Sequence, residues 1–277
     1  MSGPSLPFSW QHLNYWHVGL FPLLLMAGAC LLYAEGMRRT PTWSTSRAIY
    51  FAAGIVVTFF ATESFIGAYD MELFSDHMVE HLLLIMVAAP LFCLSAPIDL
   101  ARAAGGPRVG AFFDSGVMSV ILHPLFGFGF YAVIIPLTHL TGFFNLMLEH
   151  EWIHHSEQIL FLVTGYLFFR PAFGVEYSTV VLHPGLRMVY IMAAVPVDTI
   201  TGLVLSLQNH NPFPAYSMMD VGSSESLLQS LHLGGGIMWI GGDALMLLWC
   251  IPVVVSWVRY ETARTKVLDA ELDAAGL

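Results

Sequence analysis

The chain has 277 residues, of which 56% are hydrophobic and only 11% are charged, and its formal net charge is −10. Soluble domains usually carry about 25% charged residues, because a surface that faces water needs them. This composition excludes an ordinary soluble domain. The sequence also has no basic patch of the kind that binds nucleic acid.

Seven apolar runs follow one another along the chain, each close to the roughly 20 residues that a helix needs to cross a bilayer. None of them shows the period-two alternation of a transmembrane β-strand. The sequence therefore predicts an all-α polytopic membrane protein, a single bundle of seven transmembrane helices over residues 1–277. The expected spans are 15–34, 48–68, 77–97, 117–137, 153–169, 186–207 and 232–258.

The basic residues predict the orientation of the chain. All ten fall on one set of alternate connections between the spans, whereas the other set carries acidic residues such as Asp70 and Glu149. Basic connections stay on the cytoplasmic side of a membrane. We expect the N-terminus outside the cytoplasm and the C-terminus inside it, in a bacterial plasma membrane. The basic residues are Arg38, Arg39, Arg47, Arg102, Arg108, Arg170, Arg187, Arg259, Arg264 and Lys266.

The histidines divide unevenly between the two predicted faces. Only His123 and His183 lie on the inner side, and the other ten lie on or near the outer face. Histidine follows no sidedness rule of the kind that arginine and lysine follow. The asymmetry therefore predicts a use for imidazole at the outer face. The ten are His12, His17, His77, His81, His139, His150, His154, His155, His210 and His232.

The strongest local pattern opens the third span. His77 and His81 are four residues apart and share one helical face, and Met78 lies three residues before His81. Imidazole together with thioether, without a cysteine thiolate, suits copper, and Cu(I) in particular, better than Mg²⁺ or Ca²⁺. The pattern predicts a copper site with these three side chains as ligands.

Further candidate ligands lie at the same depth on other spans. His139 ends the fourth span, His154 and His155 open the fifth, and His232 opens the seventh. We rank His154 and His232 next after the third-span residues, followed by His139 and His155. For any single histidine, the alternative is an interfacial side chain bonded to water, a lipid headgroup or a carbonyl group.

Carboxylates inside apolar spans are the second signal. Glu63, Asp198 and Asp243 have no lysine or arginine at their depth, so each is expected to be protonated, hydrogen-bonded to another span or bound to a cation. Asp198 and Asp243 lie about 16 Å deep at 1.5 Å per residue, and we do not expect them to contact the copper directly. Glu80 and Glu157 lie near the histidines and are expected to orient the imidazole rings.

Three blocks of sequence resemble one family. The stretch LFSDHMVEHLLLIMVAAPL, from Leu73 to Leu91, resembles the signature of the seven-span CtaG family of cytochrome c oxidase assembly factors. Residues 154–169, which include Glu157 and the run FLVTGYLFF, and residues 235–239, GGIMW, resemble two further blocks of that family. The resemblance extends from about Thr58 to Leu248. The chain departs from the pattern at Gln158, where a second histidine is expected, and at the start of the last span.

The resemblance implies a role in maturing the copper-containing core of a respiratory haem–copper oxidase, at its CuB centre, without catalytic turnover. An oxidase subunit would be the partner, together with an external copper donor protein. The sequence leaves open which donor and oxidase are involved, and whether the protein forms a homodimer.

Three other functions stay open. An intramembrane zinc-dependent hydrolase would use histidines, an acid and a zinc-bound water, although the seven-span hydrolases carry their HxxxH pair in the last span. A b-type cytochrome would need axial histidines at both membrane depths, and the inner side offers only His123 and His183. A copper permease would need a ladder of ligands across the bilayer, and the methionines are too scattered to form one.

Overall fold

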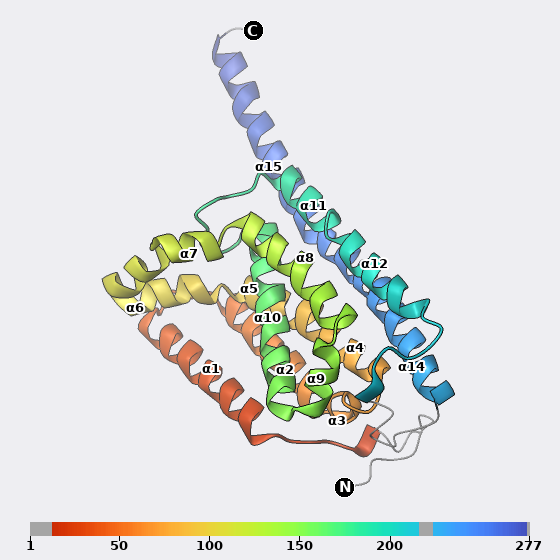
Figure 1. Cartoon of the computed structure of the whole chain (residues 1–277). Coiled ribbons are helices and arrows are strands. Elements are labelled where there is room, and N and C mark those ends of the chain that lie inside the picture. The colour runs from red at the N-terminus through yellow and green to blue at the C-terminus, as the bar shows by residue number, and fades with distance from the viewer. Residues whose placement is uncertain (1–12, 216–223, 276–277) are drawn as a thin grey trace.

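The structure is a computed structural model that describes residues 13–215 and 224–275, and all regular elements in this part of the chain are helical (Figure 1). The first half contains α1 (Leu20–Arg39), α2 (Thr45–Glu63), α3 (Phe65–Tyr69), α4 (Phe74–Leu82), the π-helix η2 (Leu83–Ala88), α5 (Ala89–Ser95), α6 (Pro97–Phe113), α7 (Gly116–Ile121) and α8 (Pro124–Leu140). The second half contains α9 (Phe143–Glu149), α10 (Glu151–Phe173), α11 (Pro184–Met192), α12 (Val195–Ser206), α14 (Ser224–Gly236), the π-helix η3 (Ile237–Gly241) and α15 (Gly242–Ala275). The predicted all-α fold class is confirmed.

Several of these segments identify an integral membrane protein. Five described segments are long and apolar enough to cross a bilayer, and the pair α8 and α9, bent by 66°, makes a sixth if it forms one span. The predicted number of seven, and the predicted orientation, stay predictions. The five segments are Leu20–Arg39, Thr45–Tyr69, Phe74–Ser95, Pro184–Ser206 and Glu225–Ala274.

Helix α10 covers the expected fifth span but is not one of these apolar segments. It carries the polar residues His154, Glu157 and Arg170, and these side chains are buried. The helix packs against α5, η2, α8, α9, α11 and α15. A helix that is surrounded by other helices need not present an apolar surface to lipid, so α10 can carry polar groups at the centre of the bundle.

Two predicted span boundaries differ from the structure. The fourth expected span is interrupted, because α7 ends at Ile121 and α8 begins at Pro124. Proline suits the first turn of a helix, where its missing N–H is not needed, and His123 caps that turn by accepting a hydrogen bond from Leu125 N at Nδ1, 3.1 Å away. The seventh expected span ends at residue 258, whereas α15 continues to Ala275 and runs away from the bundle (Figure 1).

We name the two ends of the bundle after their characteristic residues. The histidine end contains α3, α4, α9 and the start of α10, and it lies at the bottom of Figure 1. The arginine end contains α6, α7 and the segment between α10 and α11. The π-helices η2 and η3 follow directly after α4 and α14, so both interrupt spans close to the histidine end.

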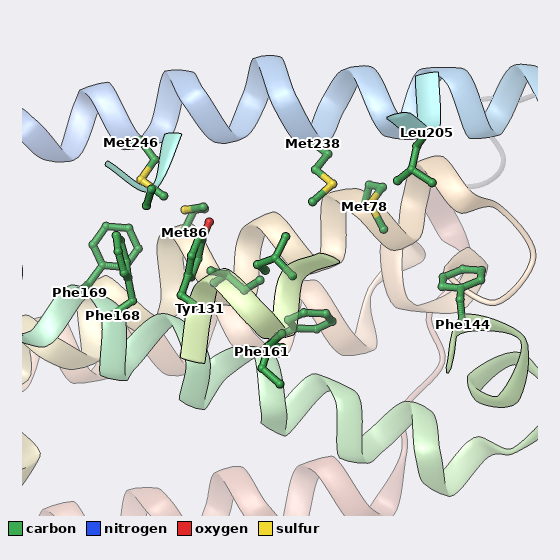
Figure 2. Packing of buried hydrophobic residues seen from close by; sticks show 14 of the residues in the cluster. Met78, Met86, Tyr131, Phe144, Phe161, Phe168, Phe169, Leu205, Met238 and Met246 are labelled. Atoms are coloured by element: carbon green, nitrogen blue, oxygen red, sulfur yellow. The ribbon is translucent and has the colours of Figure 1, made fainter. Parts of the chain in front are cut away.

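The hydrophobic core lies between α10 and the helices on either side of it. Met246 of α15 and Met86 of η2 lie close to Phe168 and Phe169 of α10 (Figure 2). Within a membrane, van der Waals packing holds helices together, because lipid is as apolar as the side chains. Gly165 illustrates this packing: a Cβ atom there would lie 2.5 Å from the carbonyl oxygen of Ile85, so only glycine lets α10 and η2 come this close.

Candidate metal centre

The fourth residue of both α4 and α10 is a histidine that is followed three residues later by a glutamate. These pairs are His77 and Glu80 on α4, and His154 and Glu157 on α10. Side chains three apart on a helix lie on the same face. The two pairs face each other reciprocally, with His77 Nε2 3.7 Å from Glu157 Oε2 and His154 Nε2 3.5 Å from Glu80 Oε2.

Three more residues complete this cluster. Asp70, directly after α3, brings its Oδ2 atom to 2.9 Å from His154 Nε2. One turn below His77, His81 Nε2 lies 3.9 Å from Glu157 Oε2. The other ring nitrogen of His81, Nδ1, lies 3.3 Å from His139 Nε2. His139 is fixed in turn by contacts of its Nδ1 with Ile135 O at 2.8 Å and with Thr138 Oγ1 at 2.9 Å.

We call Asp70, His77, Glu80, His81, His154 and Glu157 the metal centre. All six are buried, with 0% of His77 and 1% of Glu157 exposed. Within the described part of the chain, no lysine or arginine forms an ion pair with its three carboxylates, whose partners are histidines. A buried carboxylate without a cationic partner is costly, so this arrangement needs a physical explanation.

The hydrogen bonding points to a cation. Nearly all buried polar atoms in folded proteins have a hydrogen-bond partner, because an unmade bond costs free energy. Here a whole set of converging atoms forms no hydrogen bond of good geometry, although His154 Nε2 and Asp70 Oδ2 lie 2.9 Å apart, and a metal ion would satisfy them together. They are Asp70 Oδ2, Glu80 Oε2, both carboxylate oxygens of Glu157, both ring nitrogens of His77, and Nε2 of His81 and His154.

The potential ligand atoms form two overlapping groups, in each of which they lie within 4.8 Å of one another. The first group is Asp70, His77, Glu80 and His154, and the second is His77, His81 and Glu157. Gln158 supports the first group by donating a hydrogen bond from Nε2 to Glu80 Oε1 at 2.6 Å. That bond leaves the second oxygen of Glu80 directed at His154.

Three predicted ligands lie elsewhere. Met78 belongs to the hydrophobic cluster and lies beside Leu205 and Met238 (Figure 2). His232 is exposed, and its Nε2 contacts the carbonyl oxygen of Gln208 at 2.8 Å. His155 reaches the centre only indirectly, through its 3.2 Å contact with Gln158 Oε1. The structure thus brings together His77, His81, His139 and His154 of the seven predicted metal ligands.

The other predicted acids accept hydrogen bonds from distant segments, one of the three roles expected for acids inside apolar spans. Glu63 accepts the N–H of Gly19, the residue directly before α1, at 2.6 Å. Asp198 accepts the hydroxyl of Tyr131 at 2.6 Å, and Asp243 accepts the hydroxyl of Thr199 at 2.8 Å. None of the three belongs to a group of potential metal ligands among the described residues.

Asp70 is the residue of the centre that the sequence does not predict, because it lies among the acidic residues of an expected outer connection. The sequence predicts that Glu80 and Glu157 only orient imidazole rings, whereas their oxygens lie among the potential ligand atoms themselves. One signal could have identified them. The spacing H-x-x-E occurs at the same depth on two spans, at residues 77–80 and 154–157.

A cavity of about 470 Å³ borders the centre and is lined by Asp70 and His154. Its wall also includes the exposed residues His17 and Glu151, so it leads from the surface to these two side chains. The remaining residues of the centre do not line this cavity. The metal centre is therefore reached from the side of Asp70 and His154.

The chain is similar to known proteins over most of its length. Residues 29–260 match the model of a family described as cytochrome c oxidase caa3 assembly factor, Caa3_CtaG. Uncharacterised proteins of Mycobacterium bovis and Mycobacterium tuberculosis are each 26% identical to it, over 98% of this chain and 43% of the relative. A protein of Mycobacterium leprae is 25% identical over 94% of this chain and 42% of its own length. The chain thus spans less than half the length of these relatives, and no solved structure matches it.

Proposed function

This chain belongs to the cytochrome c oxidase caa3 assembly factor family, and on that premise we propose that it binds copper in the metal centre and supplies it to a haem–copper oxidase during assembly. The observation that carries the proposal is the convergence of buried imidazole and carboxylate atoms without hydrogen-bond partners. The copper is cargo, so the protein performs no catalytic turnover. An oxidase subunit receives the metal, and an external copper donor provides it.

The donor atoms bear on the form of copper that is bound. Met78 packs in the hydrophobic cluster, so the centre offers imidazole nitrogen and carboxylate oxygen without a soft sulfur ligand. Such ligands suit Cu²⁺ or Zn²⁺ better than Cu(I). We therefore propose Cu²⁺ as the bound form, in place of the Cu(I) favoured by the sequence pattern.

The surrounding residues hold the ligands in position. Gln158 fixes Glu80 through its 2.6 Å hydrogen bond, and His139 fixes the ring of His81 through their 3.3 Å contact. Such supporting contacts typically change metal affinity by about 10–100-fold. The cavity beside Asp70 and His154 gives copper its path to the centre.

The proposal places the histidine end outside the cytoplasm of a bacterial cell. With α10 as a central span and α8 with α9 as one bent span, the five apolar segments become seven crossings. Single cysteines that replace Glu72 and Arg108, in a protein with Cys30, Cys93 and Cys250 changed to serine, should react with an impermeant thiol reagent from opposite sides. Labelling of both from one side would contradict this orientation.

The function is tested with the double variant His77→Leu, His81→Leu. Removing two direct ligands should lower copper affinity by more than the roughly 10–100-fold typical of supporting contacts. Copper content of the purified protein and activity of the oxidase in cells are the two measurements. The oxidase should carry its haems but lack activity, and added copper should partly restore it.

The matched control is His183→Leu at the arginine end, where the ring is 48% exposed and only its Nε2 lies near a carboxylate, 3.8 Å from Glu261. This variant should keep both copper and oxidase activity. Thermal unfolding in detergent should show that all variants are folded. A double variant that binds copper normally and still matures the oxidase would rule out the proposed function.

One observation favours a second function, zinc-dependent hydrolysis within the membrane. The cavity reaches Asp70 and His154, so an ion held there would be open to water and to a substrate, as catalytic zinc is. This function predicts zinc in the purified protein and chelator-sensitive hydrolysis of a lipid amide. Copper without such hydrolysis would decide for the assembly role.

A further inference from the structure

We propose that the metal centre holds two metal ions at once, in adjacent positions that share His77; this inference rests on the proposed function. Position A is formed by Asp70, Glu80 and His154, and position B by His81 and Glu157. His77 is the member common to both groups of potential ligands.

His77 is suited to bridge two ions. A histidine that binds one metal ion normally donates its other ring N–H to a carboxylate, a carbonyl group or water. Both ring nitrogens of His77 are buried and without a hydrogen-bond partner. The ring of His77 is close to both of the other rings, with its centroid 3.9 Å from that of His81 and 5.9 Å from that of His154. A deprotonated imidazole binds one metal ion at each nitrogen.

The charges of the centre support two ions. Its three carboxylates carry a formal charge of −3, and no lysine or arginine pairs with them in the described chain. One divalent ion leaves a net charge of −1 in a buried site, which is unfavourable. Two divalent ions together with a deprotonated His77 give zero, since four positive charges meet four negative ones. The ring proton of His77 is released to the solvent, as metal binding generally releases protons.

The two positions differ in access. Asp70 and His154 of position A line the cavity of about 470 Å³, whereas His81 and Glu157 of position B do not. Position B is closed by Phe161, whose ring centroid lies 4.0 Å from that of His81, and by His139. An ion in position A therefore exchanges with the surroundings faster than an ion in position B.

The test loads the purified full chain in detergent with Zn²⁺ or Cu²⁺ and measures bound metal per chain. Two ions per chain are expected. With Cu²⁺, the bridging ring should couple the two spins, so the paramagnetic resonance signal should account for much less copper than chemical analysis finds. Release of Zn²⁺ to a chelator should proceed in two phases of different rate.

Two variants separate the positions. His154→Gln should leave one Cu²⁺ per chain, a full uncoupled resonance signal and only the slow phase of Zn²⁺ release. His81→Gln should also leave one uncoupled ion, but with only the fast phase. His150→Gln is the matched control, because His150 lies one turn before His154, at the exposed N-cap of α10, and belongs to neither group, and it should retain two coupled ions.

The outcomes distinguish the two proposals. One ion per chain in the wild type, lost in both variants, would overturn the pair of positions and leave the proposed function intact. Two ions with a full resonance signal would overturn the bridging role of His77. If the wild type binds neither metal, the proposed function fails as well. Thermal unfolding of each variant shows whether a loss of metal reflects a loss of fold, and Asp70→Asn and Glu157→Gln repeat the test at other ligands of the two positions.

Discussion

The two ends of the bundle both bury charged side chains, but they satisfy them in different ways. At the arginine end, Arg170 is 1% exposed, and its guanidinium donates to the carbonyl oxygens of Leu122 and Tyr177. Glu176 accepts the N–H of Ile98 at 2.5 Å and the hydroxyl of Tyr166. These charges bond mostly to the main chain of connecting segments, and so they hold those segments in place.

At the histidine end, the buried charges point at one another instead. The nitrogen and oxygen atoms of the metal centre approach to between 2.9 and 3.9 Å but leave most of their hydrogen-bonding capacity unused. Burial of charge is therefore no sign of function by itself. The two ends differ in whether their buried polar atoms already have hydrogen-bond partners. Variants at each end can test this contrast.

The largest effect on stability is expected at the arginine end, for Arg170→Met. The change leaves two buried carbonyl groups without their donor, each worth about 1–3 kcal/mol, so the free energy of unfolding should fall by several kcal/mol. Copper affinity of the protein that remains folded should be unchanged. The measurements are thermal unfolding in detergent and copper titration, and a variant as stable as the wild type would contradict the structural role.

The next effect concerns Asp70→Asn at the histidine end. The metal-free protein should be at least as stable as the wild type, because a buried charge with no lysine or arginine partner is removed. Stabilisation by metal, about 2.7 kcal/mol when the free ion is at 100 times its Kd, should shrink strongly. The comparison requires unfolding temperatures with and without Cu²⁺. Equal stabilisation of both proteins by Cu²⁺ would exclude Asp70 as a ligand.

A smaller effect depends on pH and involves Glu176. Burial raises the pKa of this carboxyl from its usual 4.5 to about 7. Because the folded protein holds this proton more tightly than the unfolded chain does, Glu176 lowers stability as pH rises from about 4.5 to about 7, and not further above that. The difference in unfolding temperature between the wild type and Glu176→Gln should follow this course. A difference independent of pH would show that Glu176 titrates normally.

The smallest effect is expected for Asp114→Asn, which makes the same chemical change as Asp70→Asn. Arg102 donates to Asp114 at 2.9 Å and lowers the pKa of this carboxyl, but the side chain is 54% exposed. Exposed ion pairs contribute little to stability. Unfolding temperature and copper content should both match the wild type, and a loss of copper here would undo the contrast between the two ends.

Much of this architecture could be predicted from the sequence. Apolar length identified the membrane class and located α1 and α2, and the spacing of His77 and His81 placed them on one face. Helical periodicity describes one helix at a time, however, and the contribution of Asp70 depends on the turn between α3 and α4. The direction of Met78 could not be predicted for a similar reason, because the neighbours α14 and η3 determine which face of α4 meets the hydrophobic cluster.

The polar helix α10 shows a second limit. Its apolar residues predict an ordinary span, whereas its burial comes from the six elements packed around it. His232 shows the opposite error. The sequence predicts it as a ligand because of its depth, but its ring contacts the carbonyl oxygen of Gln208 and does not belong to the metal centre. Depth along a helix can be read from the sequence. The direction in which a side chain points toward other helices depends on how the bundle assembles.

The π-helix η2 (Leu83–Ala88) has a consequence for how the third span is built. A π turn accommodates one residue more than an α turn, and each residue of an α-helix advances the chain by about 100°. Helix α5, which follows η2, is therefore rotated about its axis by about 100° compared with its position in an uninterrupted α-helix. This extra residue lets α5 keep the phase that packing against α2 and α10 requires, while His77 and His81 keep the phase that turns them toward Glu157. Deleting one residue from η2 would remove this rotation between α4 and α5. Either α5 could pack against α2 and α10, or His77 and His81 could face Glu157, but not both.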